Sequence, residues 1–436
     1  MKPALTTSLS VIVRPGRLLA GLVTVDGSKN AALPLLAAAA VTRRTIHLDN
    51  VPASADVAAM LMLLQHSGCH LARSVNDPHA IALTPGPGRM PAPEVPGAAR
   101  IRASYYLVPA LLASCGQARL PWPGGCRIGE RGMELHFAVY AAFGDKVETD
   151  DGGYQVTAAA GHGPQEVAVD LPFRSRGASV VAVLRAVAGH QRLLLTHPNH
   201  SPEFTGMLDA LQQAGWGIDL GADTLTVEPP ARAQPPTVTW TVPGDKIEAG
   251  TLACAIAATG GSGRIEGVRG HEVAVVVEAL NRAGIPAAWE HTAVVVHGGG
   301  NPTGRGIRAV ASLSPGGLDA DFEPALMALA LSLPGTHLFA DSINPGRHGN
   351  LLPQLARLGA DIVELSPTQC RLIGPQRLTG AAVEATDIRT GSALIVAALT
   401  ARGTTTISGM GQLQRGHADL PGKLRALGAD LREVAA

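Results

Sequence analysis

The chain has 436 residues, more than one compact domain ordinarily holds, so we expect at least two domains. Apolar residues make up 46% of the chain and charged residues 16%, which supplies a large core and argues against disorder. Basic and acidic residues balance at 35 each and aromatic residues make up only 3%, so a nucleic-acid or anionic-membrane partner is not expected.

The five cysteines form no Cys-x-x-Cys pair, and their number is odd. This usage indicates a reducing compartment rather than a disulfide framework or a zinc site. Arg14 and Arg17 interrupt the N-terminal apolar stretch, so no signal peptide is expected. The richest apolar run, 33–41, is far shorter than the ~20 residues of a membrane helix. We therefore predict a soluble, cytoplasmic protein.

One pattern recurs along the whole chain: an Ala- and Leu-rich helix, a short turn, and then a strand. Its six copies are Leu33–Leu48, Leu107–Leu120, Val180–Leu195, Leu252–Val268, Leu326–Ala340 and Leu394–Ser408. Each copy precedes an amphipathic helix closed by a glycine, in turn Gly68, Gly144, Gly215, Gly284, Gly359 and Gly428. The copies lie roughly 70 residues apart, so each predicted unit holds two helices and several strands. Six units divide into two α/β domains of three.

Two segments outside the predicted helices suggest where the chain passes between these domains. The Pro-rich segment 229–236 lies between units three and four, where a domain boundary is expected. The segment Gly21–Lys29 precedes unit one and is either a crossing strand or a second hinge.

The first half of the chain carries two candidate reactive segments. Asp26-Gly27-Ser28-Lys29-Asn30 directly precedes an Ala-rich helix, so Lys29 lies where an anion can meet a helix N-terminus. The alternative is a helix cap with a solvated lysine. The segment Pro123–Arg131 surrounds Cys126 with glycines and arginines, which lower the pKa of a thiol. Cys126 is therefore a candidate nucleophile or proton donor, although a lone cysteine is more often inert and buried.

The second half carries a pair of carboxylates and most of the candidate arginines. Asp321 is either a general base or a helix cap. Asp319 and Asp321 lack a further ligand at the spacing that a divalent metal needs, so no metal is expected. Four arginines lie beside predicted helices, where each suits a carboxylate or phosphate or else a surface salt bridge: Arg102, Arg347, Arg389 and Arg415. P-loop, HExxH and GxSxG motifs are missing from the sequence.

Together these motifs resemble the enolpyruvyl transferase family, most closely its UDP-N-acetylglucosamine 1-carboxyvinyltransferase branch. The similar segments begin at Gly21 and read GSKNAALPLLAAA, DNVP, IRAS, GQARL, PGGCRIGER, ELH, DKIEAGT, ATDIR, QRGH and KLRALGA. The resemblance implies an α/β fold of two inside-out barrel domains, each with three βαβαββ-type units. The first domain is then 28–240, with the Cys loop. The second is 1–27 with 241–436, carrying the Asp base and the Arg cluster.

The resemblance also implies transfer of the enolpyruvyl group of phosphoenolpyruvate to a hydroxyl of a uridine nucleotide, without metal or redox cofactor. Cys126 would protonate or covalently hold phosphoenolpyruvate, and it is the thiol that fosfomycin alkylates in this family. Asp321 would be the base, and Lys29 would contact the phosphate. The substrate-binding residues implied in the same way are Asn30, Arg102, Arg131, Leu135, His136, Ser175, Arg176, Gly177, Arg347, Arg389 and Arg415.

Departures from the family pattern concern the acceptor. The run 174–179, Arg-Ser-Arg-Gly-Ala-Ser, stands where the family usually has Ser-Val-Gly-Ala-Thr at the nucleotide diphosphate. Gly132 and Glu134 replace a usual Pro and Asp near the uracil. UDP-N-acetylglucosamine, for peptidoglycan precursor synthesis, is the family default. UMP, through its 3'-hydroxyl in nucleoside-antibiotic biosynthesis, is the rival acceptor.

Two further interpretations are less well supported. Enzymes that transfer the same group to shikimate 3-phosphate share the fold, but they typically have Ser after the Lys and no loop Cys. Asn30 and Cys126 argue against that acceptor. A non-catalytic nucleotide-binding paralogue is disfavoured because the candidate catalytic residues are present together.

Overall fold

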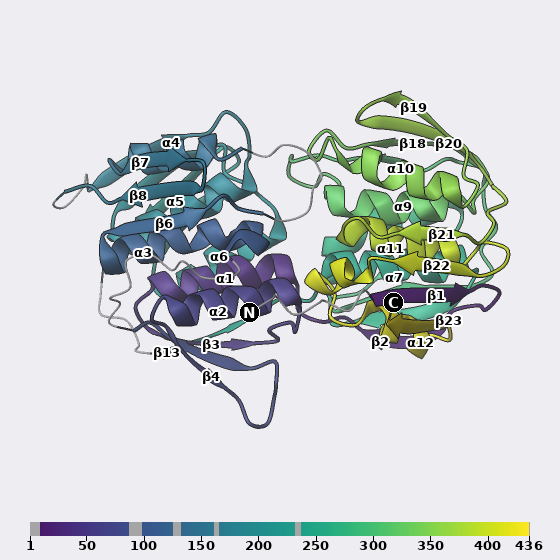
Figure 1. The fold of residues 1–436 in the computed structure, drawn as a ribbon, viewed down its shortest axis with the longest axis horizontal. Helices are drawn as coiled ribbons and strands as arrows, with labels where there is room; N and C mark the ends of the chain where they lie inside the picture. The colour runs from purple at the N-terminus through teal and green to yellow at the C-terminus, as the bar shows by residue number, and fades with distance from the viewer. Residues whose placement is uncertain (1–8, 87–97, 125–131, 161–164, 232–236, 436) are drawn as a thin grey trace.

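The computed structural model describes residues 9–86, 98–124, 132–160, 165–231 and 237–435, arranged in two lobes side by side (Figure 1). Each lobe has its own cluster of buried hydrophobic residues. The cluster of the first lobe draws on residues 31–242, and that of the second on residues 11–25 and 247–431. Within the described residues, no helix combines the length and apolar character needed to span a membrane.

The first lobe combines helices with short strands. Its helices are α1 (Lys29–Val41), α2 (Ala55–His66), η1 (Ala98–Arg100), η2 (Arg102–Leu107), α3 (Val108–Cys115), α4 (Glu134–Ala142), α5 (Arg176–Gly189) and α6 (Pro202–Gln213). Its strands are β3 (Thr45–Asp49), β4 (His70–Arg73), β5 (Ile81–Thr84), β6 (Gln117–Pro121), β7 (Lys146–Asp150), β8 (Gly153–Thr157), β9 (Glu166–Asp170), β10 (Arg192–Thr196), β11 (Gly217–Leu220), β12 (Thr224–Glu228) and β13 (Thr237–Thr241).

The second lobe likewise combines helices with short strands. Its helices are α7 (Lys246–Ala258), η3 (Gly270–Val273), α8 (Ala274–Ala283), η4 (Ala320–Phe322), α9 (Glu323–Ala330), α10 (Arg347–Arg357), α11 (Ile388–Ala398), η5 (Met410–Arg415) and α12 (Leu420–Ala426). Its strands are β1 (Leu9–Arg14), β2 (Ala20–Thr24), β14 (Ser262–Glu266), β15 (Ala287–Trp289), β16 (Ala293–Val296), β17 (Arg308–Val310), β18 (Gly335–Ala340), β19 (Ile362–Ser366), β20 (Gln369–Gly374), β21 (Ala382–Glu384), β22 (Thr405–Ser408) and β23 (Asp430–Ala435).

The predicted repeat is confirmed by the sheets. In unit three, β9 and β10 pair in parallel and are connected through α5. Helix α6 then leads to the hairpin β11–β12, and β12 pairs antiparallel with β10. The same strand arrangement recurs in units one, four, five and six as β13-β3-β5-β4, β15-β16-β14-β2, β17-β18-β20-β19 and β21-β22-β1-β23. Unit two shows three strands in the described residues, β6-β8-β7. The described residues therefore form five mixed sheets of four strands and one antiparallel sheet of three.

The glycines predicted to close the second helix of each unit have left-handed backbone geometry. All six have φ between 81° and 100°: Gly68, Gly144, Gly215, Gly284, Gly359 and Gly428. A residue with a Cβ is strained in this region, which is why glycine ends these helices. In the first copy of the repeat, the turn between the Ala-rich helix and the strand is Thr42-Arg43-Arg44 and has no glycine. Arg43 itself takes a left-handed φ of 55° in this turn.

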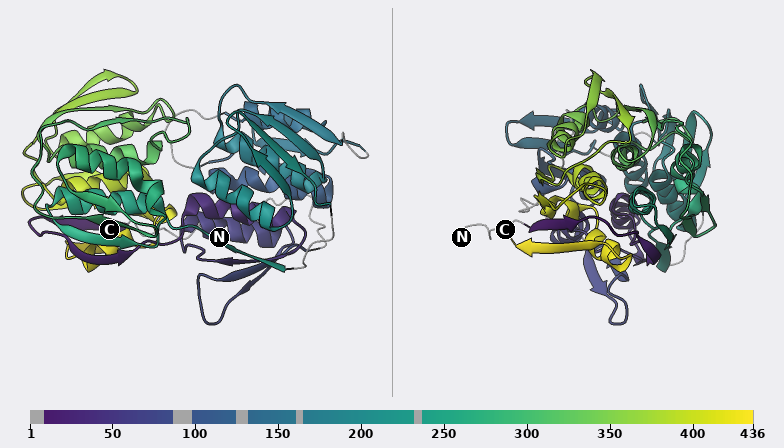
Figure 2. Two further views of the ribbon diagram at one scale, coloured as in Figure 1. Left: turned by 180° about the vertical axis from the view of Figure 1, so that it is seen from behind. Right: turned by 90° about the vertical axis from the view of Figure 1, so that its right-hand side faces the viewer.

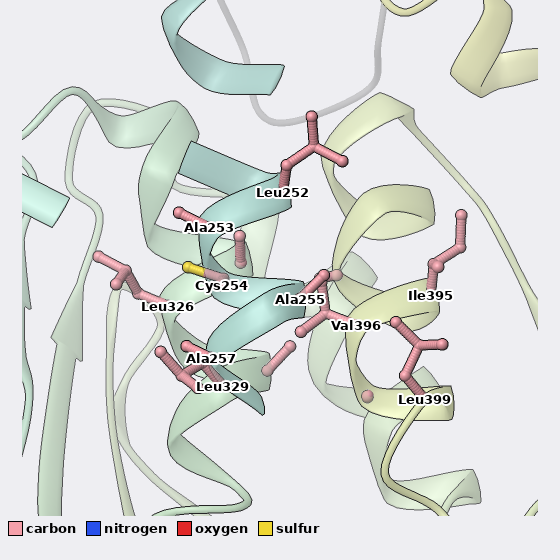
Figure 3. Packing of buried hydrophobic residues seen from close by; sticks show 14 of the residues in the cluster. Leu252, Ala253, Cys254, Ala255, Ala257, Leu326, Leu329, Ile395, Val396 and Leu399 are labelled. Carbon is pink, nitrogen blue, oxygen red and sulfur yellow. The ribbon is translucent and has the colours of Figure 1, made fainter. Parts of the chain in front are cut away.

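The helices lie inside and the sheets outside. Seen along the long axis, the helices of the second lobe occupy the middle and the strands surround them (Figure 2, right). The central helices are buried along their whole length, as α1 is from Ala31 to Val41. Small side chains permit this packing: Ala253 and Cys254 of α7 lie on the side of α9, and Ala255 lies near Val396 of α11 (Figure 3).

The chain passes between the lobes twice, through two adjacent segments. Gly27 and Gly244 form an antiparallel bridge, and Ser28 N donates to Pro243 O at 2.7 Å. A Cβ at Gly27 would lie 1.9 Å from Asn50 O, and one at Gly244 would lie 1.8 Å from Gly267 O, so both positions require glycine. Strand β2 consequently pairs with β14 in the second lobe, while β13 returns to pair with β3 in the first.

Candidate active site

A cleft of about 830 Å³ lies between the lobes and is lined by both of them. Helices of both lobes begin at this cleft. Lys29 is the first residue of α1, Arg176 of α5, Lys246 of α7 and Arg347 of α10, and Arg389 is the second residue of α11. Each helix N-terminus carries partial positive charge and free backbone N–H groups, and here a cationic side chain adds a full charge. The cleft is therefore suited to a ligand with several negative charges.

A carboxylate joins Lys29 to a further cation, Arg415, across the lobe boundary. Asp56, in the first turn of α2, accepts from Lys29 Nζ at 3.0 Å and from Arg415 Nε at 3.0 Å. Lys29 and Asp56 belong to the first lobe, whereas Arg415 ends η5 in the second. A second bond from Arg415, to Arg100 O at 3.3 Å, also crosses the boundary. Two cations are thus held side by side, as a phosphate group requires.

Asp321 lies between two arginines of the second lobe. Arg347 Nη2 donates to Oδ1 of Asp321 at 2.7 Å, and Arg389 Nη2 donates to Oδ2 at 2.8 Å. Burial alone would raise the pKa of Asp321, but the charges of Arg389 and Arg347 lower it well below its usual value. The carboxylate is therefore ionised, and both of its oxygens accept from guanidinium groups that line the cleft.

A third cluster ties α5, α6 and α7 to the segment before α9. Arg176 Nη2 donates to Asp319 Oδ2 at 3.2 Å, and Lys246 Nζ lies 3.1 Å from Glu203 Oε1 and 3.0 Å from Asp319 Oδ2. Two of these pairs, Arg176–Asp319 and Lys246–Glu203, cross between the lobes. Burial would lower the pKa of Lys246, but Glu203 and Asp319 outweigh it and raise the pKa. Lys246 therefore stays charged inside the cleft.

The nucleotide end predicted in the first lobe is a compact group of rings against a helix N-terminus. The ring centroids of His136 and Tyr105 lie 4.5 Å apart, and a Cβ at Gly177 would lie 2.6 Å from His136 Nε2 and from Tyr105 Oη. Burial and the charge of Arg102 lower the pKa of His136 to about 3, so its imidazole is neutral. Ser175 caps α5 by accepting from Ala178 N at 3.4 Å. The amide groups of the first turn of α5 thus meet the cleft beside a neutral ring.

The structure brings most of the sequence-predicted site residues to this one cleft. Those that line it are Lys29, Asn30, Arg102, Leu135, His136, Ser175, Arg176, Gly177, Asp321, Arg347, Arg389 and Arg415. Cys126 and Arg131 lie outside the described residues. Arg174, the first residue of the run 174–179 that departs from the family pattern, does not line the cleft: it bonds Asp223 at 2.7 Å and the carbonyls of Pro198 and Ala222.

Sequence reasoning assigned no role to four residues that hold this arrangement together: Asp56, Glu203, Lys246 and His417. Lys246 lies in the motif DKIEAGT and His417 in the motif QRGH, so the motifs themselves could have indicated that these two residues belong to the site. Asp56 and Glu203 stand in the first turns of predicted helices, where a carboxylate ordinarily reads as a cap. Among the described residues, no group of three or more His, Cys, Asp or Glu side chains is arranged to hold a metal ion.

Known proteins resemble the chain over nearly its full length. A family model for EPSP synthase (3-phosphoshikimate 1-carboxyvinyltransferase) matches residues 13–424. The UDP-N-acetylglucosamine 1-carboxyvinyltransferase of Sphingopyxis alaskensis is 33% identical over 432 residues, which cover 98% of this chain and 99% of the relative. UDP-N-acetylglucosamine 1-carboxyvinyltransferase 3 of Symbiobacterium thermophilum is 34% identical over 423 residues, covering 96% and 97%.

Solved structures show the same extent of similarity. The crystal structure of the enolpyruvyl transferase NikO from Streptomyces tendae is 26% identical in sequence, with a TM-score of 0.85 over 99% of this chain and 100% of that chain. An EPSP synthase structure from Acinetobacter baumannii, 17% identical, has a TM-score of 0.75 over 98% and 100%, which is a likeness of fold. The sequence and structure matches therefore include both lobes and the cleft between them.

Proposed function

Because this chain belongs to the EPSP synthase family of enolpyruvyl transferases, we propose that it moves the enolpyruvyl group of phosphoenolpyruvate to a hydroxyl of a uridine nucleotide and releases phosphate. The convergence of cations from both lobes on one cleft is the observation that supports this reaction best. Phosphoenolpyruvate carries a phosphate and a carboxylate on a small carbon frame, so it needs several cations at short range. The two lobes act as the two predicted domains, 28–240 and 1–27 with 241–436.

The two pairs of cations have a natural division of labour. Lys29 and Arg415, already held together by Asp56, receive the phosphate. Arg347 and Arg389, already held around Asp321, receive the substrate carboxylate. Closing the lobes over the substrate excludes water and strengthens each of these contacts.

The chemistry needs one base and one acid. The acceptor hydroxyl adds to C2 of phosphoenolpyruvate while Asp321 takes its proton, and Cys126 gives a proton to C3. The C2–O bond then breaks and phosphate leaves with the bonding electrons, C3 returns a proton to the Cys126 thiolate, and the vinyl double bond forms again. Asp321 and Cys126 are assigned here from the resemblance, and Asp321 also stands beside the arginines that receive phosphoenolpyruvate.

We take UDP-N-acetylglucosamine as the acceptor, as in the curated relatives that the chain resembles. Its uracil is assigned to the side of the cleft formed by Leu135 and His136, and its phosphates to the N-terminus of α5, at Ser175 and Gly177. Asn30, at the start of α1, then faces the hydroxyl that reacts. The product of this transfer, enolpyruvyl-UDP-N-acetylglucosamine, is a peptidoglycan precursor, and we place the reaction in the cytoplasm.

A specific observation favours UMP as a second candidate acceptor. Arg176 spans the cleft to Asp319 at the point where the diphosphate is assigned. A Cβ at Gly132 would also lie 1.8 Å from Glu134 Oε2, so the Glu134 carboxylate occupies space that the family's usual proline would need. The wall near Arg102 is thus altered in two coordinated positions, which suits a different nucleotide, reacting through its 3'-hydroxyl in nucleoside-antibiotic biosynthesis.

Phosphate release with phosphoenolpyruvate separates these acceptors. We expect phosphate release with UDP-N-acetylglucosamine and none without an acceptor. Phosphate release with UMP but not with UDP-N-acetylglucosamine would establish the second candidate. Arg389→Gln should lose release with either nucleotide. Arg192→Gln is the matched control, because Arg192 pairs with Glu166 and Glu228 on an outer sheet and should keep full activity. No release with either nucleotide would overturn the proposed function.

A further inference from the structure

His417 contacts Arg389 but does not itself line the cleft. Nη1 of Arg389 lies 3.0 Å from Nε2 of His417, and the imidazole is only 3% exposed. A guanidinium donates and never accepts, so Nε2 must be unprotonated and act as the acceptor. The proton of the neutral imidazole is therefore on Nδ1, which fixes the tautomer from geometry alone.

The surroundings of His417 keep the ring neutral. Its Nδ1 lies 3.9 Å from Asp245 Oδ2 and 3.9 Å from Glu248 Oε1, both on the α7 side. Burial, then Arg389 of α11, Lys29 of α1 and Lys423 of α12 lower the pKa of His417 well below its usual value, against Asp321 of η4. The same cations would repel an imidazolium, so the acceptor role persists through the neutral pH range.

Arg389 is thus held from two sides. Its Nη1 is bound to His417, and its Nη2 is bound to Asp321 at 2.8 Å. Of these two partners, Asp321 is the one that a substrate carboxylate displaces in the proposed reaction. When that exchange occurs, His417 is the contact that keeps the guanidinium plane facing the cleft.

We infer that His417 is a positioning residue, which holds Arg389 through a neutral Nε2 acceptor so that Arg389 binds the carboxylate of phosphoenolpyruvate. This inference rests on the proposed function for the identity of the substrate. It goes beyond that function by assigning a task to a buried residue that touches no substrate. It makes the affinity for phosphoenolpyruvate, rather than for the nucleotide, depend on residue 417.

Two substitutions separate an acceptor role from simple packing. Glutamine places Oε1 near the position of Nε2, so His417→Gln should keep KM for phosphoenolpyruvate within about threefold. His417→Leu has no acceptor and should raise that KM about 10- to 100-fold, the usual effect of losing a hydrogen bond to a charged group. KM for the nucleotide should change little in either variant. A wild-type KM in His417→Leu, or equal defects in both variants, would overturn the inference.

His337→Leu is the matched control for loss of a buried imidazole. His337 is fully buried on β18 and accepts from Ile307 N at 3.0 Å, and it does not line the cleft. His337→Leu should lower the melting temperature without raising KM for phosphoenolpyruvate. A comparable rise in KM in this control would show that stability, not positioning, explains the effect of residue 417.

A second readout needs no turnover and therefore separates this inference from the proposed function. In ¹⁵N-histidine-labelled protein, the signals of residue 417 are those lost in His417→Gln. We expect them to report the Nδ1–H tautomer, with Nε2 unprotonated, from pH 6 to 8. An Nε2–H tautomer or an imidazolium in this range would refute the hydrogen bond to Arg389, whatever reaction the protein catalyses.

Discussion

Asp321 is bound by Arg347 and Arg389 in the substrate-free protein, and this changes how it can serve as a base. A carboxylate between two guanidinium groups is a weak base, because its pKa lies well below the usual value despite burial. In the reaction that we propose, the carboxylate of phosphoenolpyruvate, which has the same charge and shape, competes for the same arginines. Substrate binding then releases Asp321 from its partners and raises its basicity when a base is needed.

Replacement of Asp321 by asparagine tests this exchange. Asp321→Asn removes the carboxylate that binds both arginines, so the dissociation constant for phosphoenolpyruvate should stay the same or fall. The base is lost, so kcat should fall about 10²- to 10⁴-fold. Titration calorimetry and phosphate release measure the two effects separately. Near-normal turnover would remove Asp321 as the base, and weaker binding would contradict the competition.

At the residue scale, the charged site residues that stand in motifs could be predicted from the sequence, but the residues that pair with them could not. Lys29 and Arg415 were identified because each stands in a recognisable segment. Asp56, which joins them, was not, because 359 positions separate it from Arg415 and the pair forms only when the lobes meet. Such a contact depends on tertiary geometry, which no local pattern contains.

At the scale of elements, the helix N-termini organise the cleft, and glycines let other groups approach them. Unit order, helix positions and closing glycines follow from local pattern, which is why the sequence predicted them. The pairing partners of β2 and β13 do not follow from local pattern. Strand β2 pairs with β14 and β13 pairs with β3, and in each case the two strands lie far apart along the chain, on opposite sides of a crossing segment. Gly177 shows the same division: its place in the cleft was predicted, its contacts were not.

Gly177→Ala should weaken nucleotide binding selectively. The added Cβ would lie 2.6 Å from His136 Nε2 and Tyr105 Oη, two buried ring groups with little room to move. Overpacking of this kind costs about 1–3 kcal/mol, so KM for the nucleotide should rise about 10-fold or more. KM for phosphoenolpyruvate, bound at other helices, should be unchanged.

Gly206→Ala is the control for this change within a helix. It lies in α6, and a Cβ there would meet no atom within 4 Å. Alanine should stabilise the helix by up to about 1 kcal/mol and leave both KM values as they are. An unaltered nucleotide KM in Gly177→Ala would show that the first turn of α5 does not contact the nucleotide.

At the scale of the whole molecule, the lobes are joined across the cleft by charge rather than by a shared core. Each lobe buries its own hydrophobic cluster. In the part of the chain that the structure describes, three ion pairs cross the cleft, namely Arg176–Asp319, Lys246–Glu203 and Arg415–Asp56. Under the proposed function, an anionic substrate competes for the cations of these pairs, and its binding replaces protein–protein contacts with contacts through the ligand.

Asp319→Asn should therefore open the substrate-free molecule without unfolding it. The change weakens the cross-lobe contact of Arg176 and removes a partner of Lys246, while both hydrophobic cores stay intact. We expect a larger radius of gyration by small-angle X-ray scattering, reversed by phosphoenolpyruvate and the nucleotide together. The melting temperature should fall by no more than about 4 °C, or ~1 kcal/mol for lobes of this size. Raising the salt concentration should expand the wild type only slightly, because the cross-lobe pairs are largely buried and salt screens buried pairs much less than exposed ones.

Glu290→Gln removes the same charge from a pair that stays within the second lobe, Glu290 with Arg264 at 2.8 Å. Its scattering should match that of the wild type at every salt concentration, because no contact between the lobes is lost. Equal expansion in both variants would mean that total charge, not the cross-lobe pair, sets the distance between the lobes. An unchanged radius in Asp319→Asn would mean that the crossing segments at Gly27 and Gly244 hold the lobes together by themselves.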